Sequence, residues 1–311
     1  MGMEPYIAVV GGVNIDICGK SAGPLIARDS NPGTVRLSLG GVGRNIAHNL
    51  RLLGCPVRML TALGEDLYAD RVEKDCARLG IDLGPAIRVP GGASSVYLAI
   101  EGPEGDMELA ICDDALARHI TPDYLAGQAE VLNGAAAVAV DTNLSAEALA
   151  WLGERCTAPI FADPVSVTKA EKLRPILGKL FLLKPNRIEL QHLSGMPCET
   201  EEEIRAAADS LLAKGLHAIA VSLGSRGCYY ADADGKSFFR RLKPVTDMAN
   251  ATGAGDAFMA GLACAYVRGL QPEDMVDYAM ACGLIAVQSE DTINPDISDA
   301  LVRRTIEAYR E

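Results

Sequence analysis

Short, fully apolar runs alternate along the chain with longer segments whose apolar residues recur at helical spacing. The first apolar run, residues 6–10, ends in Gly11 and Gly12, which predicts a buried strand that enters a tight turn. Further buried strands are predicted at residues 57–62, 135–140, 160–162, 180–184 and 218–223, and helices at residues 44–53, 69–79, 145–155 and 204–214. Because strands alternate with helices, the pattern predicts an α/β fold with a doubly wound, Rossmann-like and mostly parallel sheet.

Two segments depart from this alternation. Residues 15–39 and 93–112 contain short runs of period-two alternation, such as Val96, Leu98 and Ile100, between turns rich in glycine and proline. This pattern is typical of antiparallel strands. We expect the two insertions to form one small antiparallel β lid over the carboxyl edge of the main sheet, within a single domain that spans residues 1–311. An ordinary edge extension or a dimer surface is the alternative interpretation.

Local signals organise the second half of the chain. Thr200 followed by Glu203 predicts a capping box, and Gly215 predicts the end of the same helix. A hairpin is expected between residues 228–231 and 236–240. The last part of the chain is rich in alanine and glycine, and helices are predicted there after Thr252, at residues 272–287 and at residues 298–309.

Composition narrows the class of partner. The 311 residues are 49% hydrophobic, and 41 acidic against 29 basic residues give a net charge of -12. This charge repels nucleic acids and anionic lipids, so neither is an expected partner. The longest apolar stretch, residues 257–267, is about half the length that a bilayer requires. A signal peptide would begin with basic residues, and none precedes the first strand. We therefore expect a cytoplasmic protein.

Cysteine and histidine give no sign of a disulfide framework or a zinc site. The nine cysteines are far apart and odd in number, and no C-x-x-C pair occurs among them. The four histidines are equally scattered. Most of the cysteines are expected to be small, reduced core residues.

One string carries catalytic chemistry. Small residues at Gly253, Ala254 and Gly255 precede Asp256 and an apolar helix, so backbone amides at the start of this helix would form an anion site. An acidic residue in a first helical turn is also a common cap. The run of small residues favours catalysis, because it leaves room for a phosphoryl group beside a carboxylate that can accept a proton from an attacking hydroxyl.

The chain resembles the ribokinase-like (PfkB) family of carbohydrate and nucleoside kinases along essentially its whole length. The motifs that carry this resemblance are GGVNID at residues 11–16, GGVGRN at 40–45, GED at 64–66, DP at 163–164, KPNxxE at 184–189, SLGSRG at 222–227 and TGAGD at 252–256. The resemblance implies a ribokinase-like fold and an ATP-dependent kinase that uses Mg²⁺.

The same resemblance implies roles for individual residues. Asp256 would be the catalytic base, and the backbone amides of Gly253, Ala254, Gly255 and Asp256 would form the anion hole. Residues implied to bind the acceptor substrate are Asn14, Asp16, Gly41, Gly43, Asn45 and Asn143, and residues implied to bind the nucleotide are Asn186, Ser222, Gly224, Gly227 and Gly255. Asn186 and Glu189 would organise Mg²⁺, although an Asn with a Glu three residues later is also a capping pair. Asp16 could likewise belong to a structural turn in the lid.

A departure from the family concerns a monovalent cation. Asn250 stands where ribokinases usually carry an aspartate that helps to bind this ion. The resemblance allows potassium as a further cofactor, and Asn250 argues against it.

A finer resemblance within the family concerns the acceptor. Within the family, the strings DSNPG at residues 29–33, GGVGRNIA at 40–47, DPVS at 163–166 and TINP at 292–295 look most like pseudouridine kinases. This implies transfer of the γ-phosphoryl group of ATP to the 5′-hydroxyl of pseudouridine. The alternatives are a kinase of ribose, of an adenosine- or inosine-type nucleoside or of a keto-deoxy sugar acid, and a nucleoside sensor without catalysis.

Base recognition is expected to come from the lid or the loops that face it. The candidate acceptors are Ser30, Asn31, Ser94, Ser95 and Asn143, with the lid favoured. A lid built from two short insertions would expose strand edges and an apolar face, so we also expect a homodimer formed through the lid.

Overall fold

The computed structural model describes residues 4–241, 243 and 248–309. Its main sheet has nine strands: β1 (Ile7–Val10), β4 (Val57–Leu60), β6 (Ile81–Asp82), β10 (Ala137–Asp141), β11 (Ile160–Asp163), β12 (Leu182–Leu183), β13 (Ala218–Ser222), β14 (Cys228–Asp232) and β15 (Ser237–Arg240). They lie in the order β15-β14-β13-β12-β11-β10-β1-β4-β6. Strands β6 to β13 in this order are parallel. The predicted hairpin adds β14, which is antiparallel to β13, and then β15, which is antiparallel to β14. The mostly parallel sheet is confirmed.

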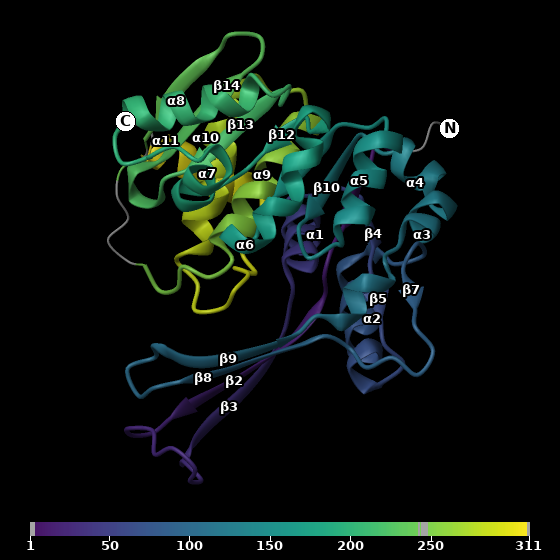
Figure 1. The fold of residues 1–311 in the computed structure, drawn as a ribbon. Coiled ribbons are helices and arrows are strands. Elements are labelled where there is room, and N and C mark those ends of the chain that lie inside the picture. The colour runs from purple at the N-terminus through teal and green to yellow at the C-terminus, as the bar shows by residue number, and fades with distance from the viewer. Residues whose placement is uncertain (1–3, 242, 244–247, 310–311) are drawn as a thin grey trace.

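Helices cover both faces of this sheet (Figure 1). The helices on one face are α1 (Val42–Leu52), α2 (Leu67–Leu79), α9 (Ala254–Val267), α10 (Pro272–Ala286) and α11 (Asp299–Tyr309). Those on the other face are α3 (Pro122–Gly127), α4 (Ala129–Asn133), α5 (Ala146–Arg155), α6 (Val167–Ala170), α7 (Arg187–Ser194) and α8 (Glu201–Leu212). Strand β1 shows why two cores form, since Ile7 and Val9 pack into the first and Ala8 and Val10 into the second. This is the doubly wound arrangement that the sequence predicts.

Some element boundaries differ from the expectation. Helix α8 begins at Glu201, because the predicted capping box of Thr200 and Glu203 forms and adds a turn before the apolar periodicity starts. The helix ends at Leu212. After it, the amides of Lys214 and Gly215 donate to carbonyls three residues earlier, which tightens the last turn. The strand predicted at residues 180–184 is only Leu182–Leu183, because the amide of Leu180 is used by the preceding 3₁₀ segment η2 (Glu171–Lys179).

The lid is a separate four-stranded sheet that projects from the main body (Figure 1). Its strands are β2 (Asn14–Ser21), β3 (Gly33–Gly40), β8 (Val96–Glu101) and β9 (Met107–Asp113). Both hairpins, β2–β3 and β8–β9, are antiparallel as expected. The central pair of β2 and β8 is parallel, because each insertion leaves the main body on its first strand and returns on its second.

Other elements join the lid to the body. Strands β5 (Ala62–Leu63) and β7 (Ile87–Arg88) form a small two-stranded sheet, and the 3₁₀ segment η1 (Ala115–His119) follows β9. All nine cysteines are free thiols, six of them buried. In the part of the chain that the structure describes, no helix combines the length and apolarity needed to cross a membrane.

Candidate active site

Polar residues gather where neighbouring parallel strands end. Asp141 and Asp163 are the last residues of β10 and β11 and are paired in the sheet register. Lys184 and Asn186 follow β12, and Asn186 forms a bridge to Ser222 at the end of β13. Carboxyl ends of parallel strands share one edge of a sheet, so side chains from four strands meet there.

Asp141 connects three segments at this edge. Its Oδ2 accepts hydrogen bonds from the amides of Gly12 at 2.9 Å and Gly43 at 2.8 Å, and its Oδ1 accepts one from the amide of Asn143 at 2.8 Å. Asp141 is fully buried, and burial raises the pKa of its carboxyl while these three amides lower it. The clamp fixes the turn after β1, the start of α1 and the loop after β10 against one another.

Asp256 lies in the first turn of α9, as the sequence predicts. The first regular helical bond runs from the amide of Ala257 to the carbonyl of Gly253, so the amides of Gly255 and Asp256 precede it at the open helix end. Gly253 has a φ of 82°, and a Cβ there would lie 2.0 Å from the carbonyl oxygen of Thr292. The chain therefore needs glycine at this position.

Asn45 approaches Asp256 from the opposite side of the site. It is buried in α1, and its Nδ2 donates to Oδ2 of Asp256 at 2.9 Å. This bond joins two of the predicted site residues, although they are 211 positions apart in the chain.

A buried ion pair lies beside Asp256. Nζ of Lys184 is 3.1 Å from Oδ2 of Asp163, and both side chains are almost fully buried. A Cβ at Gly255 would lie 3.4 Å from the same ammonium, so Lys184 reaches the start of α9. Burial and the charge of Asp163 raise the pKa of Asp256 to about 7, while the Asn45 hydrogen bond and Lys184 lower it. The Asp256 carboxyl therefore changes its protonation state near neutral pH.

The predicted acceptor residues Asn14 and Asp16 lie in β2 at the base of the lid. Burial raises the pKa of Asp16 to about 6, and the nearby Arg44 opposes the rise. A Cβ at Gly40 would lie 1.9 Å from the Asp16 carboxylate. Asp16 therefore packs against Gly40 at the end of β3, and it lies in a strand and not in the lid turn that is the alternative for it.

Two glycines at the start of α1, Gly41 and Gly43, allow close backbone contact. Gly41 is the residue before the helix and has a φ of 93°, and a Cβ on it would lie 2.5 Å from the carbonyl oxygen of Gly12. A Cβ on Gly43 would lie 2.8 Å from the backbone of Gly11. Both predicted positions therefore serve the approach of α1 to the turn after β1.

Asn186 and Glu189 form the capping box that was the alternative for them. Oδ1 of Asn186 accepts from the amide of Glu189, and Oε2 of Glu189 accepts from the amide of Asn186, both at 2.8 Å. Glu189 is buried, and burial raises the pKa of its carboxyl. Amide and carboxylate oxygens are also ligands that suit Mg²⁺, so the donor set fits this ion.

The predicted nucleotide loop follows β13. The amide of Ser222 donates to the carbonyl of Pro185 at 2.9 Å, which holds this loop against Asn186. Gly224 and Gly227 have positive φ angles of 60° and 92°, and a Cβ at Gly227 would lie 2.0 Å from the carbonyl oxygen of Arg240. The glycines thus permit a tight turn at the carboxyl edge of the sheet.

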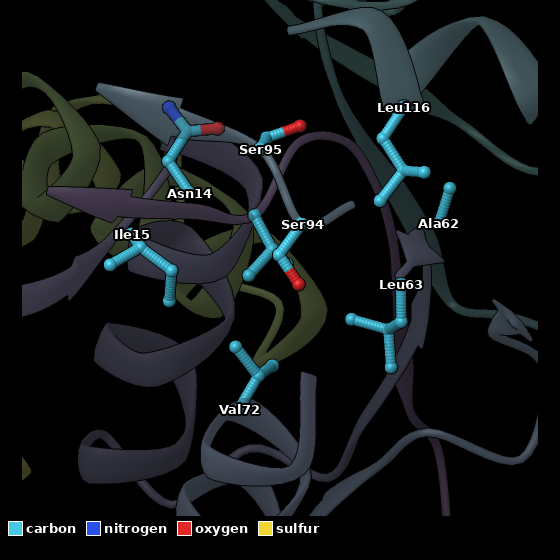
Figure 2. Close-up of a pocket in the computed structure, with 9 residues that line it drawn as sticks. Asn14, Ile15, Ala62, Leu63, Val72, Ser94, Ser95 and Leu116 are labelled. Atoms are coloured by element: carbon cyan, nitrogen blue, oxygen red, sulfur yellow. The ribbon is translucent and has the colours of Figure 1, made fainter. Parts of the chain in front are cut away.

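Asn143 lies across the site from this loop. It lines a small hollow, partly open to solvent, together with Gly12, Val13, Asn14, Thr61, Ala62, Ser95, Asp114, Ala117 and Ile120. A second hollow adjoins it and shares four of these residues, and its lining of Asn14, Ile15, Ala62, Leu63, Val72, Ser94, Ser95 and Leu116 is labelled in Figure 2. Both hollows lie between the base of the lid and the main body.

The other candidates for base contact are engaged elsewhere or lie at the sheet tip. Asn31 organises the turn of the first hairpin through bonds to the backbone of Ile26, and Ser30 is exposed in the same turn. Ser94 donates its hydroxyl and its amide to Asp66. Asn250, the position tied to a monovalent cation, accepts from the amide of Thr252 and donates to the carbonyl of Glu290.

Comparisons with known proteins show the family to which the chain belongs. Residues 4–299 match the family described as pfkB family carbohydrate kinase. The chain belongs to the PfkB family. This PfkB kinase is 39% identical to the pseudouridine kinase of Escherichia coli (strain K12) over 99% of its own length and 98% of that protein. It is 28% identical to a guanosine-inosine kinase of Exiguobacterium acetylicum, over 95% of the chain and 99% of that protein.

The fold has a close structural counterpart. The Arabidopsis thaliana ribokinase, solved with ribose and ATP, superposes with a TM-score of 0.87 at 23% identity, over 98% of this chain and 99% of that one. This confirms the ribokinase-like fold. As a member of the family, the PfkB kinase is a phosphotransferase that acts on a hydroxyl group of a sugar or nucleoside.

Sequence reasoning missed several residues that organise the site. Lys184 lies in the KPNxxE motif and Asp141 directly follows the predicted strand at residues 135–140, but neither is among the predicted site residues. Lys169 and Asp114, which lie beside Asn143, are not among them either. For Asp141 the usable signal is a carboxylate directly after a fully apolar strand. For Lys169 and Asp114 the sequence holds no such signal, because they come from segments 55 residues apart.

The Asp141→Asn substitution is expected to destabilise this PfkB kinase. An amide group would present N–H donors to amides that need an acceptor, and leaving a buried donor unpaired costs about 1–3 kcal/mol. Thermal unfolding should show a clearly lowered Tm. The exposed Asp123→Asn variant in α3 removes the same charge and should change the free energy of unfolding by no more than about 0.5 kcal/mol. Equal effects of the two variants would contradict the clamp.

Proposed function

We propose that this PfkB kinase transfers the γ-phosphoryl group of ATP to the 5′-hydroxyl of pseudouridine, giving pseudouridine 5′-phosphate and ADP. The observation that carries the kinase chemistry is the hydrogen bond from Asn45 to Asp256 at the start of α9. The 39% identity to the pseudouridine kinase of Escherichia coli supports the choice of acceptor.

We assign Asp256 as the general base. Asn45 holds Oδ2, and the other carboxylate oxygen accepts the proton of the 5′-hydroxyl. The 5′-oxygen forms a bond to the γ-phosphorus, the bond from that phosphorus to the bridging oxygen breaks, and ADP leaves with the electron pair. The amides of Gly255 and Asp256 at the helix end stabilise the negative charge on the transferring group.

The remaining predicted residues divide between the two substrates. Asn14, Asp16 and Asn45 bind ribose hydroxyls, since amide and carboxylate groups suit vicinal hydroxyls. The Ser222–Gly227 loop binds the nucleotide, and Asn186 and Glu189 would hold Mg²⁺ through their oxygen atoms. The bound ion supplies positive charge that neutralises the triphosphate oxygens.

The pH dependence of catalysis tests the base. Asp256 acts only when deprotonated, so kcat/KM should fall as the pH drops through about 7. Replacing the buried cation in Lys184→Met removes a charge that lowers this pKa, so the acid limb should move to higher pH, whereas Lys184→Arg should keep it near the wild-type position. The Asp256→Asn variant should lower kcat by about 10²–10⁴-fold without a matching loss of ATP binding. A variant with near-normal turnover would exclude Asp256 as the base.

The acceptor is tested with a panel of purified substrates. Pseudouridine should be preferred over uridine and free ribose by about tenfold or more in kcat/KM, because an acceptor for the extra ring N–H is left without a donor when uridine binds. Inosine and guanosine belong in the panel because of the 28% identical guanosine-inosine kinase. Preference for another acceptor would leave the kinase mechanism standing and overturn the pseudouridine assignment.

We also propose that a second copy covers the lid. The pairing register places side chains from all four strands on one apolar face: Ile17, Val35, Leu37, Leu98, Ile100, Leu109 and Ile111. At the outer end of this face Val35, Leu109 and Ile111 are exposed, the first by 74%. Exposed apolar patches of this kind favour association.

Light scattering at micromolar concentration should therefore give the mass of a homodimer. Ile111→Glu places a charge on the apolar face and should produce monomers. Glu104→Lys in the turn between β8 and β9 changes an exposed residue away from that face and should leave the dimer intact. A monomeric wild-type protein would contradict the lid interface.

A further inference from the structure

Three polar side chains from separate segments meet beside the hollow that contains Asn14. Nζ of Lys169 in α6 donates to Oδ1 of Asn143 at 2.5 Å and lies 3.5 Å from Oδ2 of Asp114. The backbone N–H of Asn143 donates to Oδ1 of Asp141, which holds Asn143 in place, and its side chain packs on Gly12. Asp114 comes directly after the lid strand β9 and starts η1. This polar triad therefore spans the junction between the lid and the main body.

The triad is available to a ligand. The side chain of Asp114 is half exposed and that of Lys169 is 27% exposed, and their contact is long for a charged pair. Asn143 and Asp114 both line the hollow. Thr61 lines it too, and its buried hydroxyl has no hydrogen-bond partner among the described residues. An unsatisfied polar atom beside a hollow points to a ligand that occupies it.

The position of Asn14 gives the direction in which a nucleoside would extend. Asn14 pairs with Gly40, two residues before α1, and α1 is the helix on which Asn45 reaches Asp256. Asn14 also lines the hollow. The hydroxyl to be phosphorylated must face Asp256. With the ribose at Asn14, the base at the opposite end of the nucleoside extends toward the hollow and the polar triad.

We propose that Asp114, Lys169 and Asn143 recognise the pyrimidine base of the acceptor, with Asp114 as the residue that selects pseudouridine over uridine. This inference rests on the proposed function. The edge of the base alternates N–H donors and carbonyl acceptors, and the triad offers a carboxylate, an ammonium and an amide oxygen in a row. Lys169 donates to a ring carbonyl, while Asp114 and Asn143 accept from ring N–H groups.

Asp114 selects pseudouridine over uridine because of one N–H group of the base. Pseudouridine has a ring N–H where uridine has a C–H, and the carbonyls are common to both. A carboxylate that accepts from this N–H is left without a donor when uridine binds, and sites of this type discriminate strongly against the analogue that lacks the group. Lys169 contacts a carbonyl that both nucleosides share and therefore strengthens binding without selecting between them.

The experiment compares Asp114→Asn and Lys169→Met with wild type on pseudouridine and uridine. Asp114→Asn should lower kcat/KM for pseudouridine by about tenfold or more, mainly through KM, and change the value for uridine by less than about threefold. Lys169→Met should lower kcat/KM for both nucleosides by a similar factor. The KM for ATP and the Tm should remain near wild type for both variants.

Two matched controls remove the same charges elsewhere. Asp106→Asn lies in the turn before β9, and Lys214→Met lies after α8, and both residues are exposed. Neither control should alter the ratio of the two kcat/KM values. If wild type prefers pseudouridine and Asp114→Asn keeps that preference, or if it loses activity equally on both nucleosides, the triad inference is overturned and the proposed function stands. If wild type itself shows no preference for pseudouridine, both are overturned.

Discussion

The site depends on how closely three backbone segments approach one buried carboxylate. Asp141 ends β10 and accepts from the amides of Gly12, Gly43 and Asn143. A Cβ at Gly11 would lie 2.3 Å from its Oδ2, so only glycine allows the turn after β1 to pass there. From this point α1 starts toward Asp256 and β2 starts toward the lid. The positions of the residues proposed to bind the acceptor substrate thus follow from the packing of Asp141, which need not itself touch that substrate.

Charged side chains gather around Lys184, near the start of α9. Asp163, Glu189 and Asp256 influence a single ammonium, that of Lys184, which is buried among them. Three carboxylates around one cation leave an excess of negative charge. Burial is the main reason why the Asp256 pKa lies above that of an exposed aspartate, and the charges of Asp163 and Asp141 raise it further. Such a site suits a triphosphate that arrives with its own metal ion, because the added positive charge offsets the excess.

Much of the fold could be predicted from the sequence, because strand and helix patterns are local. The apolar runs at residues 135–140 and 218–223 and the capping box at Thr200 correspond to observed elements. The position of Asp256 at a helix start was also predictable, since small residues before an apolar run define it. The parallel pairing of β2 with β8 was not, because it joins segments about 80 residues apart and no local signal sets that register. For the same reason the meeting of Asp114, Lys169 and Asn143 appears only once the chain is folded.

The parallel pair at the centre of the lid has a consequence for the order of folding. Strand β2 follows β1 directly, whereas β8 comes after β7, so the two strands can align only when β1 and the β5–β7 sheet are already side by side. Contacts that close long loops form late, since their entropic cost must be met by structure that already exists. We therefore expect the lid to assemble last and to open first. Hydrogen exchange in β2 and β8 should then be faster than in β1 and β10 of the main sheet.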